Sequence, residues 1–205
     1  MASALVYVVD DDESVRTSLA RLLRAAQLAV TTLDSARTFL DCEPHPGPVC
    51  VVLDVRMPGL DGLELQEALR GRPEQIVFLS GYGNVPMCAQ AMKNGAVDFL
   101  IKPVGSEELL AAVHRALEQS ATAHQRAAER AAVRARLDTL TPREFEVLQH
   151  VIAGMLNKQI ADRLGTAIKT IKIHRGRLMF KMRAASVSEL VRLAQVGGVG
   201  PAPAA

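Results

Sequence analysis

The sequence predicts two domains: an α/β domain built on a parallel sheet, followed by a smaller all-α domain. Three observations lead to this prediction. Short apolar runs alternate with helical patterns over residues 1–120, only helical patterns follow residue 138, and the net charge changes sign between the two halves. A chain of 205 residues is long enough for two such domains.

The predicted strands are apolar runs of about five residues, often β-branched. They cover residues 6–9, 29–33, 49–53, 76–79 and 97–101. Near-continuous apolar strands separated by helices indicate a parallel sheet buried on both faces. Apolar residues at helical spacing cover residues 15–26, 35–41, 63–70, 85–94 and 107–120. Five β-α units predict a flavodoxin-like fold with a five-stranded parallel sheet, whose ligands lie beyond the carboxyl ends of the strands.

The segment 118–138 contains neither Gly nor Pro, so we expect it to continue the last helix of the first domain as a helical linker. The expected organisation is a first domain over 1–120, a linker over 121–138 and a second domain over 139–197. The remaining segment, 198–205, is rich in Gly, Pro and Ala, and we expect it to be disordered.

The second domain begins with the signals of a helix start. Thr141 is the expected N-cap, Pro142 the first helical residue, and Glu144 completes a capping box. The helix continues to residue 152 and ends at Gly154. A short helix over 157–164 follows and ends at Gly165.

A third helix is expected over 167–182, capped by Thr166, with four apolar residues facing inward: Ile168, Ile171, Leu178 and Met182. A short helix, a tight turn and a long helix predict a helix-turn-helix. On a last helix, the apolar residues Val187, Leu190, Val191 and Leu193 fit either a dimer seam or the core.

Charge and composition limit the partners. Residues 1–117 contain 10 Lys and Arg against 15 Asp and Glu, a net charge of −5, whereas residues 139–205 contain 10 against 4, a net charge of +6. A basic second domain is consistent with a nucleic-acid partner. No apolar run is long enough to span a bilayer, there is no export signal, and the three cysteines lack metal-ligand spacing. We therefore expect a cytoplasmic protein with no membrane partner.

Acidic residues follow two predicted strands. The first strand ends in Asp10-Asp11-Asp12-Glu13, and the third ends in Asp54. Because these strand ends are neighbours in such a sheet, Asp10, Asp11 and Asp54 are expected to converge. Converging carboxylates repel one another unless a cation neutralises them, and Mg²⁺ suits one or two carboxylates with several waters.

Two more strand ends add a hydroxyl and a cation: Ser80 follows the fourth strand, and Lys102 precedes Pro103 after the fifth. A carboxylate nucleophile, a metal, a hydroxyl and a lysine are the groups that formation of an acyl phosphate requires. Each residue also has an ordinary reading. Ser80 could cap a strand, Lys102 could lie on the surface, and Asp10 to Asp12 could form a solvated turn.

The segments Val9–Arg16, Leu53–Gly62 and Ala91–Pro103 resemble two-component receiver domains in order and spacing over residues 5–118. The resemblance implies that Asp54 accepts a phosphoryl group. Mg²⁺ would be held by Asp10, Asp11, Asp54 and the backbone carbonyl of Arg56. Ser80 and Lys102 would grip the phosphoryl group, and Phe99 would be the aromatic that rotates on switching. Asp12 falls at a variable position and is interpreted as loop. Ser80 stands where Thr is more usual, and Tyr82 and Asn84 alter the following loop.

Residues 137–197 resemble the LuxR/NarL/FixJ type of DNA-binding domain, and both halves together are most similar to the FixJ subgroup. The third helix carries basic residues and no acidic one. The resemblance implies base contacts by Lys172 and Ile173, with Gly176 facing the groove. It also implies phosphate contacts by Asn157, Lys158, Lys169, Thr170 and Arg175. We interpret His174 as packed or phosphate-facing.

The sequence thus predicts a phosphorylation-dependent transcription regulator rather than an enzyme. A sensor histidine kinase would be its phosphodonor, and promoter DNA, RNA polymerase and a second copy of the chain would be its partners. Activation is the more usual outcome in the family that it resembles. Two alternatives are a phosphatase with an aspartyl-phosphate intermediate and a receiver that only binds proteins. Such phosphatases place the nucleophile after the first strand and need a substrate cap, whereas here the candidate nucleophile follows the third. The sequence leaves the stimulus, the kinase, the operator and the target genes open.

Overall fold

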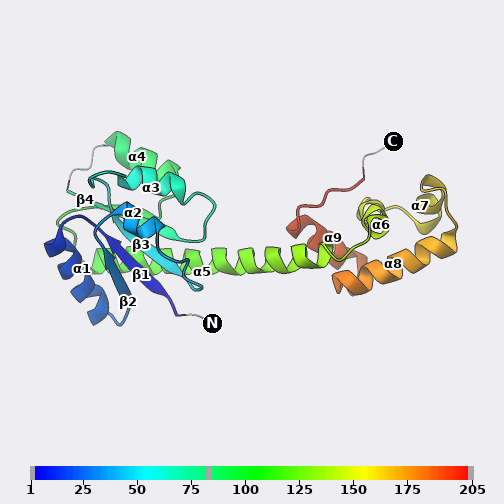
Figure 1. Cartoon of the computed structure of the whole chain (residues 1–205), viewed down its shortest axis with the longest axis horizontal. Coiled ribbons are helices and arrows are strands. Elements are labelled where there is room, and N and C mark those ends of the chain that lie inside the picture. Colours follow the sequence, from blue (N-terminus) through cyan, green and yellow to red (C-terminus); the bar gives the residue numbers. More distant parts are fainter. Residues whose placement is uncertain (1–2, 82–84, 203–205) are drawn as a thin grey trace. The chain divides into compact units, whose positions relative to one another are not determined.

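The computed structural model describes residues 3–81 and 85–202, and the chain divides into two compact units, residues 1–125 and 126–205 (Figure 1). Each unit has its own core. The loop positions Tyr82 and Asn84, for which we expect an altered loop, lie outside the described residues. No helix in the described part of the chain is both long and apolar enough to cross a membrane.

The first unit contains a parallel sheet in the order β2-β1-β3-β4-β5, which confirms the predicted fold class. Its strands are β1 (Leu5–Val9), β2 (Ala29–Leu33), β3 (Val49–Asp54), β4 (Gln75–Ser80) and β5 (Asp98–Ile101). All residues of β3 are buried, as expected for a central strand covered on both faces. The register pairs Val9 of β1 with Leu53 of β3, so the residues that follow, Asp10 and Asp54, lie at the same edge.

Helices cover both faces of this sheet (Figure 1). The helices are α1 (Glu13–Ala25), α2 (Ala36–Leu40), α3 (Gly62–Ala68), α4 (Val85–Lys93) and α5 (Ser106–Leu137). One buried cluster joins the sheet to α2, α3 and α4 and contains Phe39, Leu65 and Ala91. The other joins the opposite face to α1 and α5 and contains Leu23 and Val113.

Helix α5 is the longest element, with 32 residues, and it continues through the segment expected to be a helical linker. Near its middle, the hydroxyl of Ser120 accepts a hydrogen bond from the Val49 N–H (2.9 Å) and donates one to the Pro73 carbonyl (2.8 Å). Residues 125–132 are exposed. The last turns belong to the second unit, because Val133 and Leu137 lie in its buried core.

The second unit is helical after α5 and consists of α6 (Pro142–Ile152), α7 (Asn157–Arg163), α8 (Ile168–Met182) and α9 (Val187–Val196). Thr141 caps α6, and Glu144 completes the predicted capping box. Two details differ from expectation. Ala167, not Thr166, is the N-cap of α8, without a side-chain cap bond, and Ile168 is 42% exposed rather than buried. Ile168 is the first residue of the helix, where the chain has not yet reached the core.

The four apolar residues of α9, for which either a dimer seam or the core was expected, differ in burial. Leu190 and Leu193 are buried in the core of the unit, whereas Val187 is exposed and Val191 half-buried. The tail has no regular secondary structure as far as residue 202. It is nevertheless attached, because Val199 N–H donates to the Ala194 carbonyl and Ala202 N–H to the Gln149 carbonyl.

Candidate functional site

A lysine and two carboxylates meet at the carboxyl edge of the sheet. Nζ of Lys102 lies 2.6 Å from Oδ2 of Asp10 and 2.7 Å from Oδ1 of Asp54. These residues follow β1, end β3 and follow β5, so three strands that are separate in sequence supply one cluster. Asp10 and Asp54 are buried, with exposures of 2% and 7%. Asp10 and Asp54 therefore converge on Lys102. Asp11, which was expected to converge with them, is exposed, and among the described residues the three carboxylates do not form one cluster.

The cluster shifts the ionisation of its members. Burial raises the pKa of Asp54 above its ordinary value, and the charge of Asp10 adds to this, although the hydrogen bonds from Lys102 and Arg56 oppose it. For Lys102, burial alone would lower the pKa. The hydrogen bonds to Asp10 and Asp54 outweigh it, so the pKa is raised. Lys102 therefore stays charged and compensates two acids.

The loop after β3 fixes the orientation of Asp54. The Arg56 N–H donates to Oδ2 of Asp54 at 2.6 Å, so Asp54 has its two oxygens on different partners. Gly62, the first residue of α3, packs on the same backbone: a Cβ atom there would lie 2.4 Å from the carbonyl oxygen of Asp54. Only glycine fits at this position without displacing Asp54. The Arg56 side chain is exposed.

Asp10 and Asp12, in the loop after β1, have different roles. Asp10 Oδ1 accepts from the Asp12 N–H at 2.9 Å, and the guanidinium of Arg16 donates to the Asp10 carbonyl at 2.7 Å. Asp12, interpreted from the sequence as loop, is the N-cap of α1 and accepts from the N–H groups of Ser14 and Val15. Asp directly before a helix is a typical N-cap, so this role could have been predicted from the sequence. Asp11 is exposed.

The remaining predicted residues of this site lie on β4 and β5. Ser80 ends β4 and is buried (2% exposed), and β4 pairs it with Ile101, the residue before Lys102. Phe99 is half-buried on β5, with its ring centroid 5.9 Å from that of Phe78. The Lys102–Pro103 peptide bond is cis. The expected set is thus distributed over the ends of four strands, with Phe99 inside β5.

The donor atoms at this edge suit a hard cation. They are carboxylate oxygens of Asp10, Asp11 and Asp54 and the carbonyl of Arg56, all of the type that Mg²⁺ prefers. Within residues 3–81 and 85–202, no three His, Cys, Asp or Glu side chains are gathered closely enough to hold a metal ion by themselves. Mg²⁺ requires only one or two carboxylates and keeps several waters, so the residues present fit it.

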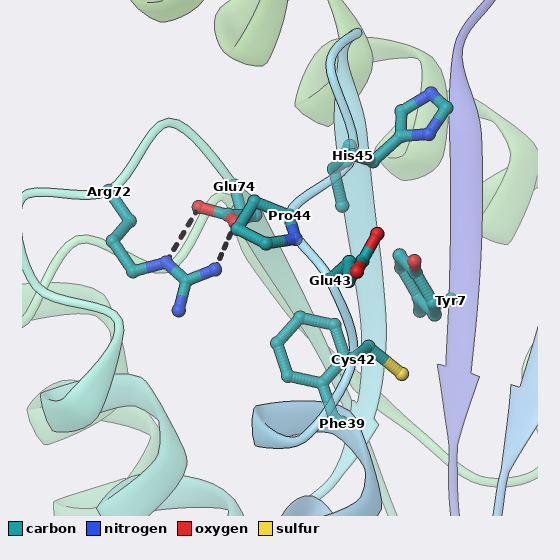
Figure 2. Close-up of a pocket in the computed structure, with 9 residues that line it drawn as sticks. Tyr7, Phe39, Cys42, Glu43, Pro44, His45, Arg72 and Glu74 are labelled. Carbon is teal, nitrogen blue, oxygen red and sulfur yellow. Dashed lines mark hydrogen bonds and ion pairs between the residues drawn. The ribbon is translucent and has the colours of Figure 1, made fainter.

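A separate small pocket lies at the amino ends of β3 and β4 (Figure 2). Tyr7 and Phe39 pack edge to face there, with ring centroids 5.1 Å apart. Arg72 is paired with Glu74 at 2.6 Å. The cavity volume is about 10 Å³, close to the minimum for one ordered water. This pocket is too small for an organic ligand and lies away from the carboxylate cluster.

In the second unit, a buried ion pair ties α6 to α8. Oε2 of Glu144 accepts from Nζ of Lys181 at 2.6 Å and from the Thr141 N–H at 2.9 Å. Burial alone would raise the pKa of Glu144, but the bonds from Lys181 and Thr141 outweigh it and lower the pKa. Lys181 is half-buried and bonded to Glu144, a role that the sequence interpretation of a basic helix did not distinguish.

Helices α7 and α8 present the predicted DNA-binding residues. Nη1 of Arg175 donates to Oδ1 of Asn157 at 2.9 Å, which links the two helices. Of the predicted contacts, Asn157, Thr170 and Arg175 are half-buried, and the exposed ones are Lys158, Lys169, Lys172, Ile173 and Gly176. His174 is half-buried with Nδ1 lacking a hydrogen-bond partner among the described residues. Helix α8 contains five Lys and Arg residues and no acidic residue.

A carboxylate and lysine cluster at the strand ends of an α/β domain, followed by a basic helix-turn-helix, is typical of a transcription regulator controlled by a receiver domain. The comparisons agree. Residues 6–114 match the response regulator receiver domain, and residues 138–194 match the luxR family of bacterial regulatory proteins. The chain belongs to the response regulators with a LuxR-type DNA-binding domain, a family of phosphorylation-dependent transcription regulators rather than of enzymes.

Its relatives include regulators of the FixJ type. The chain is 44% identical to the transcriptional regulatory protein FixJ of Azorhizobium caulinodans over 199 residues, which covers 96% of this chain and 94% of that protein. Among solved structures, response regulator StyR is 43% identical, with a TM-score of 0.80, covering 95% of this chain and 99% of that one. Full-length FixJ from B. japonicum is 41% identical, with a TM-score of 0.54, covering 97% and 98%. The predicted resemblance to the FixJ subgroup is confirmed.

Proposed function

We propose that Asp54 is the phosphoacceptor of this regulator, that a sensor histidine kinase supplies the phosphoryl group, and that the phosphorylated chain binds promoter DNA as a homodimer. The observation that carries the proposal is the position of Asp54. Its carboxylate is held at the strand edge by Lys102 at 2.7 Å and by the Arg56 N–H at 2.6 Å. A carboxylate oriented on both oxygens is a positioned nucleophile.

In the proposed transfer, an oxygen of Asp54 attacks the phosphorus of a phosphohistidine on the kinase. The new O–P bond forms as the P–N bond breaks, and the kinase histidine leaves. Asp10, Asp11, Asp54 and the carbonyl of Arg56 would hold Mg²⁺, which would offset negative charge on the phosphoryl oxygens. Lys102 would exchange one carboxylate contact for a phosphoryl oxygen.

Phosphorylation adds a charge of about −1.5 to −2 at this edge. The hydroxyl of Ser80, buried at the end of β4, would donate to a phosphoryl oxygen, and Phe99 on β5 would change its packing against Phe78. These shifts would change the surface formed by α4 and β5. Two receiver domains would then pair through the changed surface. A dimer would then bind two half-sites through α8 and recruit RNA polymerase in the cytoplasm. Activation of transcription is the outcome that we propose.

The exposure of Lys158, Lys169, Lys172, Ile173 and Gly176 supports the DNA contacts that we propose. Lys172 and Ile173 would face base edges. Gly176 would also face the groove, at a position where the helix has no side chain. Lys158 and Lys169 would bind phosphates, together with Thr170. Asn157 and Arg175 would bind phosphates as a pair, because their hydrogen bond holds both side chains at the junction of α7 and α8. The net charge of +6 over residues 139–205 supports binding to a polyanion.

The test uses wild type, Asp54→Asn and Asp41→Asn, each treated with acetyl phosphate and Mg²⁺. Asp41 is the control, because its carboxylate is exposed and pairs with Arg37 one helical turn away. Intact mass would report uptake of one phosphoryl group, and light scattering would report the size in solution. We expect uptake and dimerisation in wild type and Asp41→Asn, and neither in Asp54→Asn. An Asp54→Asn protein that still took up phosphate and dimerised normally would contradict the proposal.

A further inference from the structure

One aromatic side chain on the DNA-binding unit lies in solvent. Phe180, on α8, is 84% exposed. The other described aromatic residues, Tyr7, Phe39, Phe78, Phe99 and Phe145, are buried or half-buried. Single exposed apolar residues are common on protein surfaces, but aromatic residues are enriched where a surface binds a partner, because one ring supplies a large contact area.

Phe180 lies on the same face of α8 as the proposed base-reading residues. Residues 169, 173, 176 and 180 are separated by four, three and four positions, which places them in one row along a helix. All four are exposed, whereas Ile171, Leu178 and Met182 on the opposite face are buried. Gly176 lies between the two apolar side chains, and no atom lies within 4 Å of a Cβ placed there. The row therefore has an open centre flanked by Ile173 and Phe180.

The charges around this row favour DNA as its partner. Helix α8 contains Lys169, Lys172, Arg175 and Arg177 besides Lys181, which is paired with Glu144, and it contains no acidic residue. The row is also continuous with the proposed DNA contacts at Lys169, Lys172 and Ile173. A second protein would need to cover these cations, whereas a DNA backbone neutralises them.

Apolar side chains find one apolar group in the major groove, the C5-methyl group of thymine. Ile173 and Phe180 are seven residues apart, which is about 10.5 Å along a helix. In helices that read the major groove, side chains seven positions apart reach bases two or three pairs apart, since positions −1, 3 and 6 of a zinc-finger helix contact three successive bases. We propose that Phe180 packs against a thymine methyl group about three base pairs from the one that Ile173 faces, and so extends the base-specific contacts to the C-terminal part of α8. This inference rests on the proposed DNA-binding function.

The experiment compares full-length wild type, Phe180→Ala and Phe180→Leu, each treated with acetyl phosphate and Mg²⁺. Wild type first selects duplexes from a random pool. Each thymine of the selected duplex is then replaced singly by deoxyuridine, which lacks only the methyl group. Because Phe180 is exposed, both variants are expected to fold, which far-UV circular dichroism would verify.

We expect wild type to lose about fourfold in affinity at two uracil positions about three base pairs apart, as for one apolar group returned to water. Phe180→Ala should bind roughly tenfold more weakly and show no penalty at one of these positions, while keeping the penalty at the other. Phe180→Leu should keep both.

Other outcomes would overturn the inference. If Phe180→Ala binds as wild type does, or shows the same uracil penalties, Phe180 does not contact thymine. If Phe180→Ala instead weakens dimerisation with unchanged binding per half-site, the ring belongs to an interface with a second copy. A wild-type protein that selects no sequence at all would contradict the proposed function itself, which separates the two failures.

Discussion

Nζ of Lys102 lies 2.7 Å from Oδ1 of Asp54, although 48 residues separate them in the chain. The same ammonium group contacts Asp10 at 2.6 Å, so one cation compensates two buried carboxylates. This arrangement places the nucleophile that we propose in a site that would be electrostatically unstable without Lys102.

Removing Lys102 should destabilise the first unit. In the absence of Mg²⁺ at pH 7, we expect Lys102→Met to lower the free energy of unfolding by about 3 kcal/mol, because two buried carboxylates lose their counter-ion. Burial already raises the pKa of Asp54, and the variant should raise it further. A carboxyl whose pKa is higher in the folded than in the unfolded state destabilises the fold at pH values above its unfolded pKa. The loss in the free energy of unfolding should therefore shrink as the pH falls towards 4. Urea unfolding followed by tyrosine fluorescence would measure it, since both tyrosines lie in residues 1–125.

The double variant Asp54→Asn/Lys102→Met provides the control for this prediction. It removes one of the two carboxylates together with the lysine, and we expect it to recover part of the lost stability. A deficit that stayed constant between pH 7 and pH 4 would show that lost packing, not uncompensated charge, is the cause.

Gly62 should be essential to the position of Asp54. In Gly62→Ala, the added Cβ would lie 2.4 Å from the Asp54 carbonyl oxygen and 3.0 Å from Cα of Val55, so the backbone must shift. We expect a loss of about 2 kcal/mol in stability and slower phosphorylation by acetyl phosphate. Gly105→Ala is the matched control, because a Cβ there meets no atom within 4 Å. Equal phosphorylation rates in the two variants would contradict the role of Gly62.

Ser120 should contribute to stability through two backbone groups. Its buried hydroxyl bonds to the Val49 N–H and the Pro73 carbonyl. Ser120→Ala leaves both without this partner, and we expect the free energy of unfolding to fall by about 2–3 kcal/mol. Thr122→Ala removes an exposed hydroxyl that bonds to the Glu118 carbonyl in its own helix, and it should change stability little. Urea unfolding would measure the loss of stability in each variant. Equal losses in the two variants would contradict the role of Ser120.

The Glu144–Lys181 ion pair should make the second unit sensitive to acid. Because the pKa of Glu144 is lowered, its stabilisation is complete above the unfolded pKa of about 4.3 and is lost as the pH falls through the lower folded value. We expect Glu144→Gln to lower stability by about 2 kcal/mol at pH 7 and by less near pH 3. Amide exchange over α6, read by mass spectrometry, would measure this unit separately.

Glu146→Gln is the control for the acid dependence, because Glu146 is exposed and pairs with Arg143 one helical turn away. It should change exchange over α6 by only a few tenths of a kcal/mol. If both glutamine variants behaved alike at every pH, burial of the Glu144 pair would not be the source of the effect.

Local patterns were sufficient to predict most of the fold. Apolar runs at regular spacing located all five strands of the sheet, and the acids and the lysine at their ends located the cluster of Asp10, Asp54 and Lys102. These predictions were correct because the carboxyl ends of parallel strands meet at one edge, so a residue's place after a strand fixes its place in space. The capping box at Thr141 and Glu144 is likewise a local signal.

What could not be predicted depends on distant contacts. Ser120 bonds to Val49, 71 residues earlier, and no spacing rule connects them. The sequence pattern did not distinguish Lys181 from the other cations of α8, because its partner Glu144 lies on another helix. The exposure of Ile168 and Phe180 depends on how α8 packs against α6 and α7, which an amphipathic pattern defines only approximately.

The packing of Val133 and Leu137 into the second core has a practical consequence for dissecting the chain. The helix-turn-helix motif begins near residue 139, but a fragment cut at that residue would lose two core side chains. It would also uncover Gly197, where an added Cβ would lie 2.4 Å from Leu137. A protease that cuts within the exposed residues 125–132 would leave this core complete. The smallest fragment that keeps native DNA affinity should therefore begin inside α5, ahead of Val133.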